Sequence, residues 1–284
     1  MKTMAVLNGT SRTGRILVER ALENEYQVKA IVRSARRFSV HISGHKNLAV
    51  EEFSDFKDIT TLQRILLNTD VLVLIAGLPI DEPNFLVQDV VQSSVAAIRA
   101  NLWKTTAIKT RVVLMSAANI SPAMDRAIDP HPFPTSLIEK FGREYVLKYT
   151  YQDLRRAQEY LFKQTSWLDF VVVAPGPIAD VPDKDAELKQ WRLSTTELPL
   201  QGPISYLRLA SLMLSIAEEG KEFNHEVVLP IPTTPVANSL KDIESVKTLV
   251  LHWFKVNVFI PGFRGLTIFA VGIAVGRWWR SWAT

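Results

Sequence analysis

Seven short apolar runs, rich in β-branched residues, recur along the chain. They lie at residues 3–8, 27–33, 48–53, 70–76, 111–116, 168–174 and 226–231. Apolar residues at helical spacing follow the first and third runs: Ile16, Leu17, Ala21 and Leu22, and then Ile59, Leu62, Ile65 and Leu66. Strands that are apolar on both faces are typical of a parallel sheet covered by helices on both sides. We therefore expect an α/β fold with a doubly wound parallel sheet and a ligand at the carboxyl ends of its strands.

Composition excludes several other classes of protein. Hydrophobic residues make up 47% of the 284 residues and charged residues 22%, as in an ordinary globular protein. The net charge of +4 gives no argument for a nucleic-acid partner, and we expect none. The chain has no cysteine, which excludes disulfides and a thiolate metal site, and its five histidines lack metal-ligand spacing, so we expect no metal. The N-terminus has no features of a secretory signal, and we expect a cytoplasmic protein.

Three stretches interrupt the alternation of strands and helices. Two of them, near residues 118–147 and 175–203, are rich in proline. Long irregular insertions are often functional, and we expect these two to form a small substrate cap. We predict that residues 1–248 form the ligand-binding domain together with this cap. Residues 249–284 form a separate apolar and basic tail.

The tail at residues 249–284 carries four basic residues and no acidic one. Its uninterrupted apolar stretch, Gly265 to Gly276, has 12 residues, whereas a membrane-spanning helix needs about 20. Tryptophan and arginine at its ends suit a lipid headgroup interface. Two interpretations stay open: contact with the core or with a second subunit in a homo-oligomer, and peripheral association with the surface of an intracellular membrane.

A turn of small residues follows the first strand and leads into a helix. This arrangement suits dinucleotide binding, because the helix N-terminus offers free N–H groups to the pyrophosphate. The sequence resembles the atypical short-chain dehydrogenase/reductases of the NmrA-like group, which have a Rossmann-type fold and a turn that reads G-A-T-G-x-T-G. The resemblance spans roughly residues 4–232. It implies a cofactor-binding turn made of Asn8, Gly9, Thr10, Ser11, Arg12, Thr13 and Gly14.

The end of the second strand indicates which dinucleotide is bound. Arg33 stands where a domain that prefers NAD usually has an acidic residue, and Ser34 and Arg37 follow. A guanidinium beside a small hydroxyl suits a 2′-phosphate, so we predict NADP(H) as the cofactor. The resemblance adds further cofactor contacts beyond the other strands: Asp55 and Phe56, Ala76 and Gly77, and the Pro-Gly loop that begins at Pro175.

Ser116 ends the fifth run and therefore faces the expected ligand crevice. In short-chain reductases a serine at this place orients the substrate carbonyl, and a Tyr-x-x-x-Lys pair follows. Tyr151 and Arg155 match that pair, with arginine in place of lysine. The resemblance implies that these three residues are catalytic. A Tyr–Arg pair on a helix surface is the alternative.

These features predict an NADP(H)-dependent oxidoreductase of the atypical short-chain type. Its substrate is expected to be a hydrophobic small molecule with a carbonyl or an activated double bond, and some relatives serve secondary metabolism. The replacement of two family glycines, by Asn8 and Ser11, and of the lysine, by Arg155, leaves two alternatives open. One is an NmrA-like dinucleotide-sensing regulator without turnover. The other is a cofactor-bound isomerase or cyclase without net redox chemistry.

Overall fold

The seven apolar runs all form strands of one sheet, as the sequence predicts. The strands are β1 (Thr3–Leu7), β2 (Gln27–Val32), β3 (Leu48–Glu52), β4 (Val71–Leu74), β5 (Arg111–Met115), β6 (Phe170–Val173) and β10 (Glu226–Pro232). An eighth strand, β8 (Trp191–Ser194), completes the order β3-β2-β1-β4-β5-β6-β10-β8. All neighbours are parallel except β8, which runs antiparallel to β10. The expected α/β fold of the Rossmann type is confirmed.

The computed structural model describes residues 1–38, 44–75, 85–103, 109–121, 148–180, 191–197 and 204–232. All of them belong to the first of the two units into which the chain divides, Met1–Ala237, and the second, Asn238–Thr284, lies outside the described residues. The predicted tail at residues 249–284 and most of the predicted cap segment at 118–147 lie outside the described residues. Within the described ranges, no helix combines the length and apolarity needed to cross a membrane.

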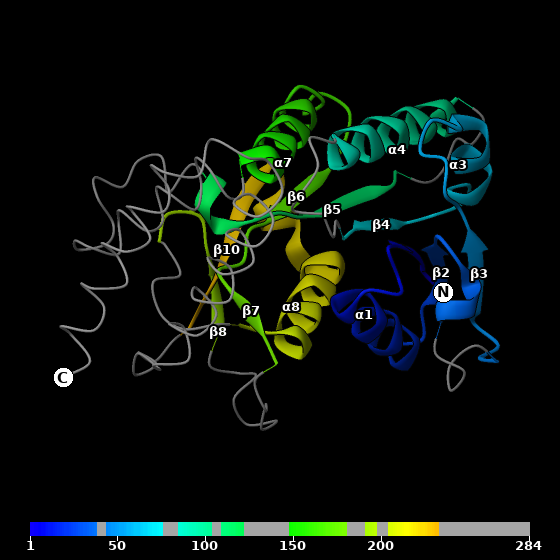
Figure 1. Cartoon of the computed structure of the whole chain (residues 1–284), viewed down its shortest axis with the longest axis horizontal. Coiled ribbons are helices and arrows are strands. Elements are labelled where there is room, and N and C mark those ends of the chain that lie inside the picture. Colours follow the sequence, from blue (N-terminus) through cyan, green and yellow to red (C-terminus); the bar gives the residue numbers. More distant parts are fainter. Residues whose placement is uncertain are drawn as a thin grey trace, which may run out of the picture. The chain divides into compact units, whose positions relative to one another are not determined.

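In the described part of the chain, α-helices cover both faces of the sheet (Figure 1). On one face lie α3 (Ile59–Ile65), α4 (Leu86–Leu102) and α7 (Lys148–Phe162), and on the other lie α1 (Arg12–Glu23) and α8 (Tyr206–Glu219). Strand β1 shows how the sequence produces two cores. Its side chains alternate, so that Ala5 and Leu7 pack into one buried cluster and Met4 and Val6 into the other.

The segment at residues 175–203, which the sequence predicts to be irregular, contains two short strands. β7 (Ile178–Ala179) pairs with β9 (Ile204–Ser205) in a separate parallel sheet. β8 adds an antiparallel edge to the main sheet, where Trp191 and Leu193 are half-buried and the residue between them is exposed. Strands of two and four residues between prolines give too little periodicity to be recognised in the sequence.

The strand order reverses between β1 and β4, because β2 lies on one side of β1 and β4 on the other. Connections leave this point in opposite directions, over opposite faces of the sheet. A crevice therefore opens at the carboxyl ends of the central strands, where open α/β sheets bind their ligands.

Candidate functional site

The turn between β1 and α1 has the conformation that a tight dinucleotide-binding turn requires. Asn8 has a φ of 64°, in the left-handed region that asparagine adopts more readily than most residues. Its N–H donates to Ile31 O at 2.9 Å, and its own carbonyl accepts Ser11 N–H at 2.9 Å. Asparagine therefore replaces the first glycine of the motif without opening the turn.

Gly14 is the position in this turn at which a side chain does not fit. A Cβ atom there would lie 2.4 Å from the carbonyl oxygen of Asn8 and 2.9 Å from Ser11 Oγ. Such contacts are shorter than any that Cβ atoms make in proteins, so the backbones approach closely because residue 14 is glycine. Gly9 is also confined, with Ala30 Cβ at 3.2 Å from such an atom.

Ser11 caps helix α1. Its backbone is extended, and its Oγ accepts the N–H of Gly14 at 3.0 Å. The N–H groups of Arg12 and Thr13, in the same first turn, have no carbonyl partner inside the helix. Together with the positive end of the helix dipole, they form an arrangement suited to the negative charge of a pyrophosphate.

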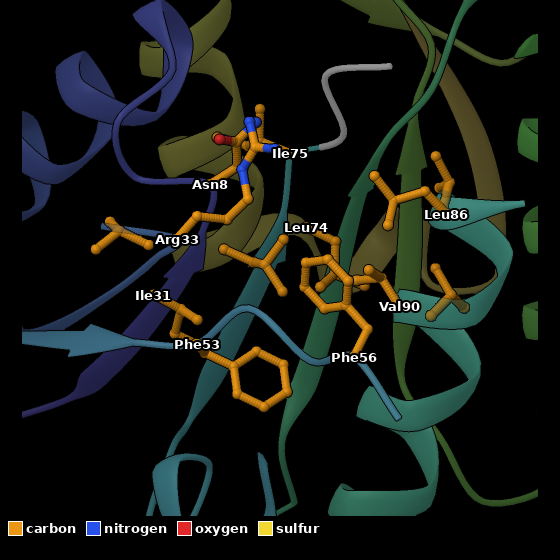
Figure 2. A pocket seen from close by; sticks show the side chains of 13 residues that line it. Asn8, Ile31, Arg33, Phe53, Phe56, Leu74, Ile75, Leu86 and Val90 are labelled. Atoms are coloured by element: carbon orange, nitrogen blue, oxygen red, sulfur yellow. The ribbon is translucent and has the colours of Figure 1, made fainter. Parts of the chain in front are cut away.

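A cavity of about 410 Å³ lies beside this turn (Figure 2). It is mainly apolar and is lined from the ends of β1, β2 and β4, the segment after β3, and the first turns of α4. The lining residues are Leu7, Asn8, Ile31, Val32, Arg33, Phe53, Phe56, Leu74, Ile75, Leu86, Val87, Val90 and Val91. An apolar cavity of this size next to a helix N-terminus can take the adenosine half of a dinucleotide, and the residues present fit such a cofactor.

Arg33 lies at the end of β2 and lines this cavity. In Figure 2, Arg33 and Asn8 are on one side of the cavity, and Leu86 and Val90 of α4 are on the other. Ser34 is half-buried and precedes a short 3₁₀ turn, η1 (Ala35–Arg37). The side chain of Arg37 lies outside the described residues.

The acid predicted to contact adenine is placed differently from its aromatic neighbour. Asp55 is exposed, and its Oδ1 accepts the N–H of Lys57 at 2.9 Å. Phe56 lines the cavity and meets Phe53 edge to face, with ring centroids 5.5 Å apart. The predicted positions Ala76 and Gly77 lie outside the described residues.

Arg12 connects the turn to the loop after β6. Its Nη1 lies 3.2 Å from Asp180 Oδ2, and its guanidinium lies 5.5 Å from the ring centre of Tyr206. The charged groups of this pair are largely exposed, so the pair adds little to stability. Its side chain nevertheless lies beside the N-terminus of α1. A guanidinium there would add to the positive end of the helix dipole and face the phosphates of a bound dinucleotide.

Ser116 follows β5 and is buried. Because Leu74 pairs with Leu114 in the sheet register, Ser116 lies one strand beyond the cavity at the same carboxyl edge. Its Oγ accepts a hydrogen bond from Nε2 of Gln158, on α7, at 2.5 Å. Pro175, which is also buried, accepts the N–H of Ala118 at 2.9 Å and so ties the loop after β6 to the segment that follows Ser116.

Tyr151 and Arg155 lie one turn apart on α7, as the i, i+4 spacing predicts. Tyr151 is partly buried against the core, and Arg155 is exposed. Gln158 lies seven residues after Tyr151, so these three side chains leave the same side of the helix. The catalytic roles of Ser116, Tyr151 and Arg155 stay predictions.

Asp153 on α7 is fully buried and holds the start of α4. Its two carboxylate oxygens accept the N–H groups of Val87, at 2.9 Å, and Gln88, at 2.7 Å. The residue that precedes α4, Phe85, supplies no side-chain cap, so Asp153 does so from another helix. Burial raises the pKa of Asp153, although the two N–H groups act in the opposite direction.

Sequence reasoning missed Asp153 and Gln158. Both are polar residues on the buried side of an amphipathic helix, and that pattern is the one signal that could have singled them out. No cluster of three or more His, Asp or Glu side chains suited to a metal ion occurs in the part of the chain that the structure describes.

The sheet order, the turn and the adjoining cavity define a Rossmann-type dinucleotide-binding protein. The chain belongs to the NAD(P)H-binding family, whose model matches residues 9–219.

The relatives are named oxidoreductases. Oxidoreductase ordB of Dothistroma septosporum is 27% identical over 262 residues, which cover 89% of this chain and 92% of the relative. Oxidoreductase stcQ of Emericella nidulans is 25% identical over 247 residues, or 84% and 85% of the two chains. Among solved structures, a short-chain dehydrogenase/reductase of Veillonella parvula in complex with NADP superimposes with a TM-score of 0.62, at 17% identity, over 81% of this chain and 94% of the other. The chain is therefore an NAD(P)H-binding member of an oxidoreductase family.

Proposed function

We propose that the protein is an NADPH-dependent reductase that acts on a carbonyl or an activated double bond of a hydrophobic small molecule. The observation that carries the cofactor choice is the position of Arg33, at the end of β2 and in the wall of the cavity. A guanidinium there can bind a 2′-phosphate through charge-assisted hydrogen bonds. The acidic residue that usually binds the free ribose hydroxyls of NAD is replaced at this position.

One acidic residue, Glu52, lies near the same segment. Glu52, at the end of β3, accepts the N–H of Ala35 at 2.6 Å, so one of its carboxylate oxygens is engaged with η1. Two arginines lie toward the phosphate end of the site: Arg33 at the end of β2, and Arg12 at the start of α1, where it pairs with Asp180. Their positive charge favours the dinucleotide that carries the additional phosphate.

At the nicotinamide end of the site, bound NADPH would supply the hydride. The chain supplies the polar groups that receive the substrate. Ser116 and Tyr151 donate hydrogen bonds to the oxygen on which negative charge develops. Arg155, one turn further along α7, adds a positive guanidinium to the same side of the helix as Tyr151.

The proposed substrate class follows from the resemblance to the NmrA-like short-chain reductases, and the names of the relatives support oxidoreductase chemistry in general. The resemblance implies a hydrophobic substrate, and some members of that group serve secondary metabolism. Two alternatives to reduction are a regulator that binds the cofactor without turnover and a non-redox isomerase or cyclase.

The cofactor claim is tested by titrating the purified full-length chain with NADPH and with NADH, and by following cofactor fluorescence. Arg33→Ala is expected to weaken NADPH binding by about tenfold to a hundredfold, the loss of a charge-assisted pair, and to change NADH binding by less than about twofold. Arg36→Ala is the matched control, because Arg36 is exposed in the same segment and does not line the cavity. Equal loss of both cofactors would refute the 2′-phosphate role.

Turnover is tested by adding quinones, ketones and aldehydes to the chain with NADPH and following the absorbance of the cofactor. Oxidation of NADPH that depends on Ser116 supports the reductase. Tight NADPH binding without oxidation across the panel would overturn it in favour of the regulator or the isomerase.

A further inference from the structure

The hydroxyl of Ser116 is held by a side chain that the family pattern does not assign. Gln158 Nε2 and Ser116 Oγ are 2.5 Å apart, although the two residues are 42 positions apart in the sequence. Gln158 is 5% exposed and Ser116 is 7% exposed, so water does not compete for this contact. A buried, short hydrogen bond of this kind fixes the position of both groups.

This hydrogen bond also determines whether Ser116 is the donor or the acceptor in the contact. An amide nitrogen carries two hydrogens and accepts none, so Ser116 Oγ must be the acceptor in this contact. The hydroxyl hydrogen of Ser116 is therefore left for a different partner, and no acceptor for it is found among the described residues. Ser116 lies at the carboxyl edge of the sheet, where open α/β sheets bind their ligands, so an oxygen of a ligand bound beside Ser116 would be the acceptor for that hydrogen.

The placement of Gln158 is secured by the rest of α7. Leu154, Ala157 and Leu161 pack into the core. Asp153 ties the helix to the start of α4 through two hydrogen bonds. Tyr151 and Gln158 are seven residues apart and share one side of the helix, so the side that holds Ser116 is also the side that carries the predicted proton donor.

We propose that Gln158 is a positioning residue that keeps Ser116 as a hydrogen-bond donor to the oxygen of the substrate. This inference rests on the proposed reductase function. A donor fixed in this way needs no reorganisation when charge develops on the substrate oxygen, and pre-oriented donors are the groups that contribute most to such a step. A glutamate at position 158 would accept the hydrogen of Ser116 and withdraw it from the substrate.

The test uses the full-length chain, NADPH and 9,10-phenanthrenequinone as a carbonyl probe. Gln158→Glu is expected to lower kcat by about a hundredfold, the effect of losing one donor to the developing charge. Gln158→Met has nearly the same length but no amide, and it should lower kcat by about tenfold, because Ser116 is free to turn. Neither variant should change the Kd of NADPH. Gln164→Glu, the same chemical change beyond the end of α7, is the matched control, because its carboxylate can still accept Trp167 Nε1–H.

A residue that acts through Ser116 loses its effect when Ser116 is absent. In the Ser116→Ala background, both Gln158 substitutions should therefore change kcat by less than about twofold. Losses that multiply with that of Ser116→Ala, or a kcat of Gln158→Glu equal to that of the wild type, would overturn the proposal. Thermal unfolding of each variant separates a folding defect from an effect on the reaction.

Failure of the proposed function has a different signature. If the wild type oxidises no NADPH with the probe, the reductase assignment fails, and the positioning role is judged from the contact itself. The side-chain amide of Gln158, followed by NMR after selective ¹⁵N-glutamine labelling, should then exchange its hydrogens slowly in the wild type and faster in Ser116→Ala. Equal exchange in the two proteins overturns the inference.

Discussion

Asp153 of α7 accepts the backbone N–H of Val87 at 2.9 Å, across 66 positions of sequence. Val87 belongs to the first turn of α4 and lines the cavity. The helix that carries Tyr151, Arg155 and Gln158 therefore also fixes the wall of the cavity in which we propose that the adenosine binds. The two halves of the site are joined by this carboxylate, and its removal should affect both.

Asp153→Asn should destabilise the fold and weaken the cofactor site. An amide offers one oxygen where the carboxylate offers two, and its NH₂ group would face a backbone N–H. The expected loss in the free energy of unfolding is about 1–3 kcal/mol, measured by urea denaturation. The Kd of NADPH should rise several-fold, because the first turn of α4 is no longer held against the cavity.

Asp89→Asn is the control for this change, since Asp89 lies in the same first turn of α4. It removes a favourable interaction with the helix dipole, worth about 0.3–1 kcal/mol, and leaves the bonds to Asp153 intact. A variant of Asp153 as stable as that of Asp89 would contradict the role assigned to Asp153.

Gly14→Ala should abolish cofactor binding before it abolishes folding. The added Cβ would lie 2.4 Å from the carbonyl oxygen of Asn8, so the turn must shift away from the position at which its N–H groups meet the pyrophosphate. Overpacking of this kind costs about 1–3 kcal/mol of stability. Calorimetric titration with NADPH should show no binding at concentrations that saturate the wild type.

Gly44→Ala supplies the comparison, because no atom lies within 4 Å of a Cβ at that position. Its stability should stay within about 0.5 kcal/mol of the wild type, and its affinity for NADPH should be unchanged. Wild-type affinity in Gly14→Ala would show that the turn tolerates a side chain and does not hold the phosphates.

Tyr26 should make the stability of the protein depend on pH in alkaline solution. Burial raises the pKa of Tyr26 to about 12, and Glu218 adds to the effect. The phenol of the unfolded chain releases its proton near pH 10. From about pH 10 to 12 the unfolded state therefore binds fewer protons than the folded state, and the free energy of unfolding falls as the pH rises.

This dependence is measured by urea unfolding at several alkaline pH values, alongside the absorbance of ionised tyrosine. Tyr26→Phe should remove the part of the slope that Tyr26 contributes, and Glu218→Gln should lower the pH at which Tyr26 ionises. An unchanged slope in Tyr26→Phe would assign the dependence to other groups.

The strands could be predicted from the sequence because they are buried on both faces. Val71–Leu74 reads as an unbroken apolar run for that reason. Helix α4 has apolar residues at helical spacing as well, but nothing in the sequence indicates that its N-terminal cap comes from residue 153. The cap of α1 is local, because Ser11 and Gly14 are three residues apart, whereas the residue that caps α4 is brought to it by folding.

The same distinction separates the predicted and the missed parts of the site. Asn8 could be predicted to replace a glycine because its backbone preference is a property of the residue itself. Gln158 could not be matched to Ser116, because the contact depends on how α7 lies against the end of β5. Arg33 lies between these two cases. Its place just after β2 could be predicted from the sequence, whereas its place in the wall of the cavity depends on the fold.

The lining of the cavity runs from Leu7 to Val91, within the first third of the chain. Ser116 and helix α7 are encoded later. During synthesis, the strands that form the cavity leave the ribosome before Ser116 and α7, to which we assign the substrate. On the proposed assignment, the cofactor site and the substrate site are encoded in successive stretches of the gene, so substitutions in the later stretch can change the substrate and leave the cofactor the same.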